Sequence, residues 1–85
     1  MTDQTKSLTK RQSEFLAMSA RGLTYQQIAE ECFVAIGTVR GTFEKARLRI
    51  GASTNVQAVV LAISREELGL THDGQVFVPS APNSL

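Results

Sequence analysis

The sequence predicts an all-α fold of four helices, followed by a short tail that is partly extended or disordered. Three observations support this prediction. Threonine is followed three residues later by glutamine at Thr9, Thr24 and Thr54, a spacing typical of helix N-termini. Between these starts, apolar residues recur at helical intervals. The 85 residues are 42% hydrophobic, which suits one compact core but not several layers of sheet and helix.

The first two helices are predicted from their start and stop signals. One begins at Thr9 and ends at residues 21–22, where Gly22 suits the left-handed position that closes a helix. The next begins at Thr24, where Leu23 and Ile28 also occupy the two positions of a hydrophobic staple. It is therefore the best-marked helix start in the sequence.

The second helix is expected to end near Glu31, and a turn over residues 32–34 leads into a third helix over residues 36–50. Gly51 closes this third helix. One narrow side of it is apolar at helical spacing and is expected to face the core: Val39, Phe43, Ala46 and Ile50.

The fourth helix is predicted over residues 54–68. Its six consecutive apolar residues, 58–63, leave it without a polar face, although a helix of so small a monomer should keep one side in water. The second apolar side therefore predicts a partner surface, most simply a second copy of the chain. The alternative is that the C-terminal tail folds back over it.

The sequence divides into a polar N-terminal arm (1–7), a helical domain (8–70) and a tail (71–85). Within the tail, residues 76–78 form a short β-like patch that either docks on the domain or pairs as a strand. The last six residues are predicted to be disordered.

The net charge of +1 is unevenly distributed. Residues 1–51 carry eight Lys or Arg against five acidic residues, whereas residues 52–85 carry one Arg against three acidic residues. Within residues 37–50 there are four basic residues and one acidic residue. This asymmetry is compatible with a binding face for a polyanion and, equally, with a solvated helix face that has no partner.

A short helix, a tight turn and a longer amphipathic helix with basic outer faces make the layout of a helix-turn-helix. The second helix of such a pair fits the DNA major groove, which is ~12 Å wide. The side of the third helix that faces away from the core carries Gly37, Gly41, Glu44, Lys45 and Leu48. A glycine at position 41 costs roughly 1 kcal/mol against alanine. It is either a device for close approach to base edges or a tolerated surface glycine.

Residues 8–68 resemble the LuxR/GerE-type helix-turn-helix domain of bacterial transcription regulators. The matching segments are Leu8-Thr9-Lys10-Arg11-Gln12, Gly22-Leu23-Thr24, Ile28-Ala29-Glu30, Phe33-Val34, Thr38-Val39-Arg40 and Gln57-Ala58. Each motif is weak by itself, but together they are strong.

The resemblance implies a regulator that binds double-stranded DNA with its third helix and dimerises through its fourth, 54–68. The single cysteine favours a reduced setting, so we expect a cytoplasmic, nucleoid-associated protein. The positions that read bases fall on Arg40, Gly41 and Glu44. Arginine can donate two hydrogen bonds to guanine O6 and N7. Expected contacts to the DNA backbone come from Thr38, Thr42, Lys45, Arg47, Arg49, Lys10, Arg11 and Tyr25. The expected dimer surface consists of Val59, Val60, Ile63 and Glu67.

The sequence departs from the family pattern at several positions. Ala35 stands where a capping serine or threonine is usual, Thr42 replaces a frequent histidine, and Asn55 replaces a usual arginine. Glu44 stands where a basic or polar residue is common. It either accepts a hydrogen bond from a cytosine amino group or repels phosphate. These departures bear on the DNA sequence preference more than on the fold.

Two alternatives compete with this interpretation. Residues 22–30, 37–40 and 46–47 are also similar to region 4 of sigma-70-type factors, which reads the −35 promoter element. A sigma factor needs a second domain for the −10 element, and we find no such domain in these 85 residues. Phe33 and the Gln57-Ala58 pair also fit the LuxR/GerE pattern better. The other alternative is a protein-interaction module, an adaptor or anti-activator that binds another transcription regulator.

Other classes of function find no support in the sequence. The single cysteine, Cys32, excludes an internal disulfide and is expected to act as a buried hydrophobe, and His72 has no ligand set around it. We expect no catalytic constellation, metal, cofactor or small-molecule ligand. No apolar run approaches the ~18–20 residues of a membrane span, and the N-terminus has no secretory signal.

Overall fold

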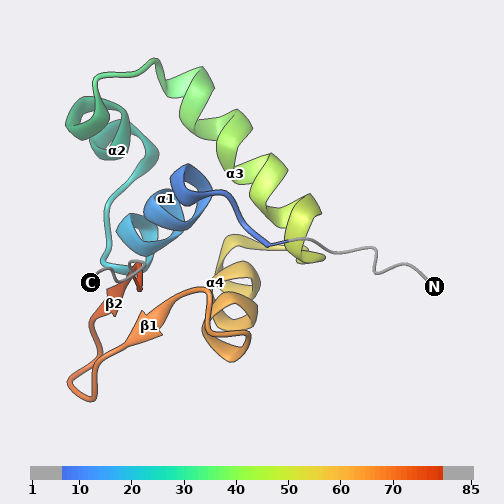
Figure 1. The fold of residues 1–85 in the computed structure, drawn as a ribbon. Coiled ribbons are helices and arrows are strands. Elements are labelled where there is room, and N and C mark those ends of the chain that lie inside the picture. Colours follow the sequence, from blue (N-terminus) through green and yellow to red (C-terminus); the bar gives the residue numbers. More distant parts are fainter. Residues whose placement is uncertain (1–6, 80–85) are drawn as a thin grey trace.

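The computed structural model describes residues 7–79, and in this range it contains four helices and one small hairpin (Figure 1). The predicted four-helix, mostly helical fold is confirmed. The N-terminal arm other than Ser7, and the six C-terminal residues predicted to be disordered, lie outside the described range. The elements in chain order are α1 (Lys10–Ala20), α2 (Tyr25–Cys32), α3 (Ile36–Ile50), α4 (Asn55–Ser64), β1 (Gly69–Leu70) and β2 (Val76–Phe77).

Helix starts follow the threonine–glutamine spacing. Thr9 and Thr24 each accept a hydrogen bond from the backbone N–H three residues on, and the glutamine side chain there accepts one back from the threonine N–H. Each such cap stabilises its helix by about 1 kcal/mol. Thr54 caps α4 in the same way, although Gln57 accepts from Ser53 N–H instead. Helix α3 begins at Ala35 without a side-chain cap.

Helix α3 is the centre of the packing. Its apolar side is buried as predicted, and it contacts α1, α2 and α4. The Phe43 ring lies between two other aromatic rings: Phe15 of α1, with centroids 6.0 Å apart, and Tyr25 of α2, stacked at 4.6 Å. These contacts fix the orientation of α3 relative to α1 and α2, and so fix what its opposite side presents to solvent.

The turn between α2 and α3 is built on Phe33. This residue has a left-handed backbone (φ 57°), and its side chain is 94% exposed. A left-handed non-glycine residue costs roughly 1–2 kcal/mol. The N–H groups of Phe33 and Val34 both bond to the Ala29 carbonyl, which ends α2 and redirects the chain into α3.

Helix α4 ends at Ser64, so the prediction of a helix reaching residue 68 is wrong. The chain leaves the helix because Glu66 adopts a left-handed conformation (φ 64°). The N–H groups of Glu67 and Leu68 then both donate to the Ala62 carbonyl, at 2.8 and 3.1 Å. This closing turn directs the Leu68 side chain into the core.

The apolar patch of the tail pairs as a strand and also docks on the domain, so both arrangements that the sequence left open occur together. Strands β1 and β2 pair antiparallel, and the hairpin packs on α1, on the side opposite to α3 (Figure 1). Val76 is buried, and its carbonyl accepts a hydrogen bond from Arg21 at 3.5 Å. The Phe77 ring lies over Gly69, where a Cβ would come within 2.3 Å of it. The hairpin crosses the division expected between residues 70 and 71.

Candidate nucleic-acid interface

The outward side of α3 is polar and open to solvent. Arg40, Glu44 and Lys45 are exposed together with Leu48, which gives this side both charges and one apolar side chain. Within residues 7–79, neither Arg40 nor Lys45 forms an ion pair. Their charges are therefore available to a ligand. The periodicity of the sequence correctly placed Glu44, Lys45 and Leu48 on the side away from the core.

Two glycines lie on the same side, one turn apart. A Cβ built at Gly37 or Gly41 would meet no other atom within 4 Å. Nothing inside the described fold therefore requires glycine at either position. The two residues leave a bare strip of backbone. At Gly41 this strip lowers stability, because helix interiors favour alanine over glycine by roughly 1 kcal/mol; Gly37 lies in the first turn of α3.

One flank of α3 holds its polar groups within the chain. The Thr42 hydroxyl donates to the Thr38 carbonyl at 2.8 Å, one turn back along the helix. Arg49 Nε donates to the Ser7 carbonyl at 2.6 Å, which ties the start of the described chain to the end of α3. The guanidinium of Arg49 keeps further donors, so this contact does not exhaust it.

The other flank contains a network that sequence analysis did not predict. Arg47 Nη1 donates to Asn55 Oδ1 at 2.6 Å, and Asn55 Nδ2 donates to the Tyr25 hydroxyl at 2.7 Å. We call these three residues the interhelix network, since they come from α3, α4 and α2. The signal available in the sequence was the asparagine at position 55, one of the departures from the LuxR/GerE pattern that the sequence analysis noted.

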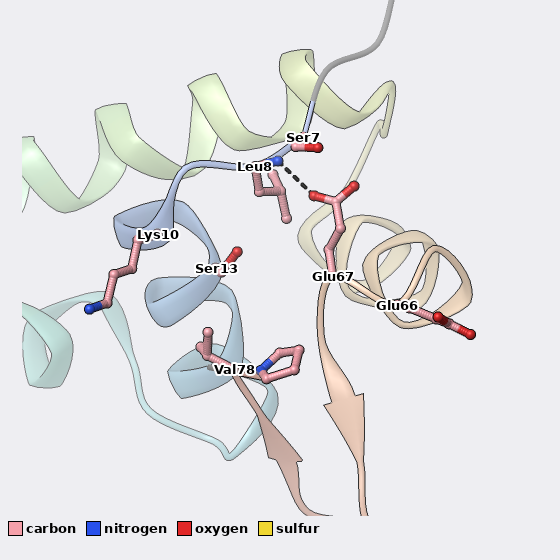
Figure 2. Close-up of a pocket in the computed structure, with 8 residues that line it drawn as sticks. Ser7, Leu8, Lys10, Ser13, Glu66, Glu67 and Val78 are labelled. Carbon is pink, nitrogen blue, oxygen red and sulfur yellow. Dashed lines mark hydrogen bonds between the residues drawn. The ribbon is translucent and has the colours of Figure 1, made fainter. Parts of the chain in front are cut away.

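The basic residues at the start of α1 differ in their surroundings. Lys10 is exposed, whereas Arg11 pairs with Glu14 at 4.0 Å and lies 5.2 Å from the centroid of the Phe15 ring. Lys10 borders an open hollow of about 490 Å³, which lies between the start of α1, the turn after α4 and the end of β2. Figure 2 shows the residues that line it.

Glu67 borders the same hollow (Figure 2). Its carboxylate accepts a hydrogen bond from the Leu8 N–H at 2.6 Å and pairs with Arg65 at 3.4 Å. The residue lies beyond the end of α4, and its polar contacts are made within the chain. It therefore stands apart from the other residues predicted for the dimer surface.

The outward side of α4 is apolar. Val56 and Val60 are 74% and 58% exposed, while Val59 and Ile63 are half-buried against the core. The hairpin docks on α1 and leaves these two valines open. Val56 is thus a member of the exposed patch that the sequence-based prediction did not include. A hollow of about 300 Å³ separates this patch from the end of α1.

Other kinds of site receive no support in the described part of the chain. Among residues 7–79, no three His, Cys, Asp or Glu side chains lie close enough together to hold a metal ion. No helix in the same range is long and apolar enough to cross a membrane. Cys32 is half-buried and packs against the core at the end of α2, as an apolar residue would.

Comparison with known proteins agrees with the fold and with the position of the helix-turn-helix. The model of the family "Bacterial regulatory proteins, luxR family" matches residues 6–62. The transcriptional regulatory protein LiaR of Bacillus subtilis (strain 168) is 39% identical over 57 residues, which cover 67% of this chain and 27% of LiaR.

A solved structure is also similar, a crystal structure of a VqmA–ligand–DNA complex from Vibrio cholera. It has a TM-score of 0.62 and 37% identity, over 76% of this chain and 28% of that one. The chain thus spans little more than a quarter of the length of either protein. The family match covers most of the chain, and the chain belongs to the LuxR family of DNA-binding bacterial transcription regulators.

Proposed function

We propose that the chain binds a specific double-stranded DNA sequence by placing α3 in the major groove. One observation carries the proposal: Arg40, which forms no ion pair within residues 7–79, lies on the flank of α3 beside Gly37 and Gly41, two positions where nothing in the described fold requires glycine. A bare strip of helix backbone beside a free guanidinium suits close contact with base edges. We also propose that the protein acts in the bacterial cytoplasm, where such a DNA target lies.

In this arrangement the outward side of α3 reads bases. Arg40 donates two hydrogen bonds to guanine O6 and N7, and Gly41 allows the helix to approach the groove floor. Glu44 accepts from a cytosine amino group or, failing that, repels the backbone. The phosphate contacts fix the register and carry little sequence information. They come from α3 and from the starts of α1 and α2: Thr38, Thr42, Lys45, Arg47, Arg49, Lys10, Arg11 and Tyr25.

The test is a selection from random duplex DNA, followed by affinity measurements on the selected sequence at several salt concentrations. We expect the selected duplex to bind at least ~10³-fold more tightly than random DNA. We also expect log K to fall linearly with log[salt], because bound phosphates release counterions. Equal, weak affinity for selected and random duplexes would argue against sequence-specific recognition.

Replacing Gly41 with alanine is expected to have opposite effects on stability and on binding. The free energy of unfolding should rise by about 1 kcal/mol, since the added methyl group meets no other atom. Affinity for the selected DNA should fall, because the methyl group holds the helix away from the base edges. Urea denaturation and DNA titration measure the two effects. A stabilised variant with unchanged affinity would identify Gly41 as a tolerated surface glycine.

We further propose that two copies of the chain dimerise through the exposed side of α4. The apolar patch formed by Val56 and Val60, with Val59 beneath it, supports this proposal. A symmetric dimer would place two α3 helices in successive major grooves, about 34 Å apart. A different transcription regulator is the other occupant that this patch suits, and the oligomeric state distinguishes the two.

Replacing Val60 with aspartate tests the dimer. A carboxylate buried in an apolar interface without a partner is costly, so the dimer dissociation constant should rise by about tenfold or more. Analytical ultracentrifugation measures it. Leu70→Asp is the matched control, because Leu70 is similarly exposed but lies on the hairpin. If both variants dimerise as the unmodified chain does, the α4 patch is not the interface.

A further inference from the structure

The interhelix network joins three helices at a single side chain. Asn55, the first residue of α4, accepts from Arg47 of α3 through its oxygen and donates to Tyr25 of α2 through its nitrogen. The Tyr25 ring is itself fixed, since it is stacked on the buried ring of Phe43 at 4.6 Å. Both ends of the network are thus held by the asparagine, and one of them also by packing.

Within the interhelix network, the Arg47 guanidinium and the Tyr25 hydroxyl keep N–H and O–H donors that the network itself does not engage. An amide carries no charge, so Asn55 orients the Arg47 guanidinium without neutralising it. Within residues 7–79, Arg47 forms no ion pair, and one amide oxygen engages only one of its five N–H groups. The Tyr25 hydroxyl accepts from Asn55, so its own proton remains free to donate. A fixed cation beside a free hydroxyl donor matches the needs of a phosphate oxygen.

The position of the network points to the same ligand. Tyr25 is the first residue of α2, where unpaired backbone N–H groups and the helix dipole favour an anion. Arg47 lies two turns after Arg40, on the same flank of α3. Arg47 also borders an open hollow of about 290 Å³ together with Glu44, Leu48 and Ala52, so it is reachable from solvent. The network therefore lies beside the proposed reading side of α3.

We propose that Asn55 is a positioning residue, which holds Arg47 and Tyr25 in place to bind one phosphodiester group of the DNA backbone. The proposal rests on the proposed DNA binding. It explains why an uncharged amide suits this position: a carboxylate would hold the same two partners but would cancel the charge of Arg47. The resulting contact adds affinity for any duplex and sets the orientation of α3 in the groove.

The experiment measures affinity for selected and random duplexes over a range of salt concentrations. Arg47→Ala should reduce the slope of log K against log[salt] by about 1 and weaken both duplexes alike. Asn55→Ala should weaken both duplexes by about three- to tenfold, because the arginine must then be ordered on binding. In a background carrying both Arg47→Ala and Tyr25→Phe, Asn55→Ala should have no further effect.

Controls separate positioning from a general loss of structure. Arg65→Ala removes the same charge at the other end of α4 and should leave the salt slope unchanged. Asn55→Asp can accept from both Arg47 and the Tyr25 hydroxyl, which then donates instead of accepting, so this variant should remain folded in urea titrations yet bind with a reduced slope. Gln57→Glu adds the same negative charge two residues further along α4, and it should reduce the salt slope less than Asn55→Asp does.

The outcomes separate this inference from the proposed function. Asn55→Ala is compared in two backgrounds, the unmodified chain and the chain carrying Arg47→Ala and Tyr25→Phe. If it weakens binding by the same factor in both, Asn55 does not act through Arg47 and Tyr25, and the inference is wrong. An Arg47→Ala variant with an unchanged slope also overturns it, while specific DNA binding stands. An unmodified chain that binds no duplex overturns the proposed function itself.

Discussion

Replacing Leu68 with alanine is expected to lower the free energy of unfolding by about 2–5 kcal/mol. Leu68 is 1% exposed and is among the largest fully buried side chains of the described chain. Its position is fixed by the turn after α4, where its N–H bonds to the Ala62 carbonyl at 3.1 Å. The cavity left by alanine would therefore have little freedom to collapse. Urea denaturation followed by circular dichroism measures the loss.

Leu70→Ala is the matched control, two residues further along the chain. The Leu70 side chain is 53% exposed on the hairpin, so its removal should change stability by no more than about 0.5 kcal/mol. Equal effects at the two positions would mean that Leu68 is not part of the core. Helical content should persist in both variants, since neither residue lies in a helix.

The contrast bears on where this domain ends. The family match stops at residue 62, yet the core also contains Leu68 and Val76. A chain that ends at Leu70 would lose Val76 and expose the surface of α1 that β2 covers. Residues 68–78 therefore complete the packing of the helical domain in this protein, and truncation experiments on DNA binding should retain them.

Local signals made the first three helices predictable from the sequence. The capping threonines at residues 9 and 24, with their glutamines, act within a few residues of each other, and the buried side of α3 follows directly from its periodicity. The end of α4 was not predictable in this way. Residues 58–63 are apolar without a break, so the pattern gives no end point. The left-handed residue in the turn after the helix is Glu66, and glutamate is not a residue type that indicates a helix end.

Gly69 directly follows residue 68, the predicted end of the fourth helix, but it does not close that helix. Glycine after a helical segment usually closes it, but here it accommodates the Phe77 ring across the hairpin. Contacts between distant residues also escaped sequence analysis at the candidate site. Asn55 bonds to Tyr25, 30 positions away, and Glu67 bonds to Leu8, 59 positions away. The outward side of α3 was predictable because it depends only on one helix.

Replacing Arg40 with alanine is expected to lower affinity for the selected DNA by about ten- to a hundredfold. A bidentate contact from arginine to guanine contributes about 1–3 kcal/mol of discrimination against the wrong base. Stability should stay within about 0.5 kcal/mol of the unmodified chain, because Arg40 is exposed and has no ion-pair partner within residues 7–79. The loss should appear as lost preference at one base pair of the site.

Lys45→Ala provides the comparison, since it removes the same charge from the same exposed side of α3. A phosphate contact carries no sequence information, so this variant should weaken selected and random duplexes by the same factor. Titrations of both variants on both duplexes at one salt concentration give, for each variant, the ratio of its affinity for the selected duplex to its affinity for random DNA. A fall in this ratio shows that the replaced residue reads bases. If Arg40→Ala also weakens both duplexes equally, Arg40 binds the backbone, and the reading of bases must then rest on Glu44 and the bare helix surface at Gly41.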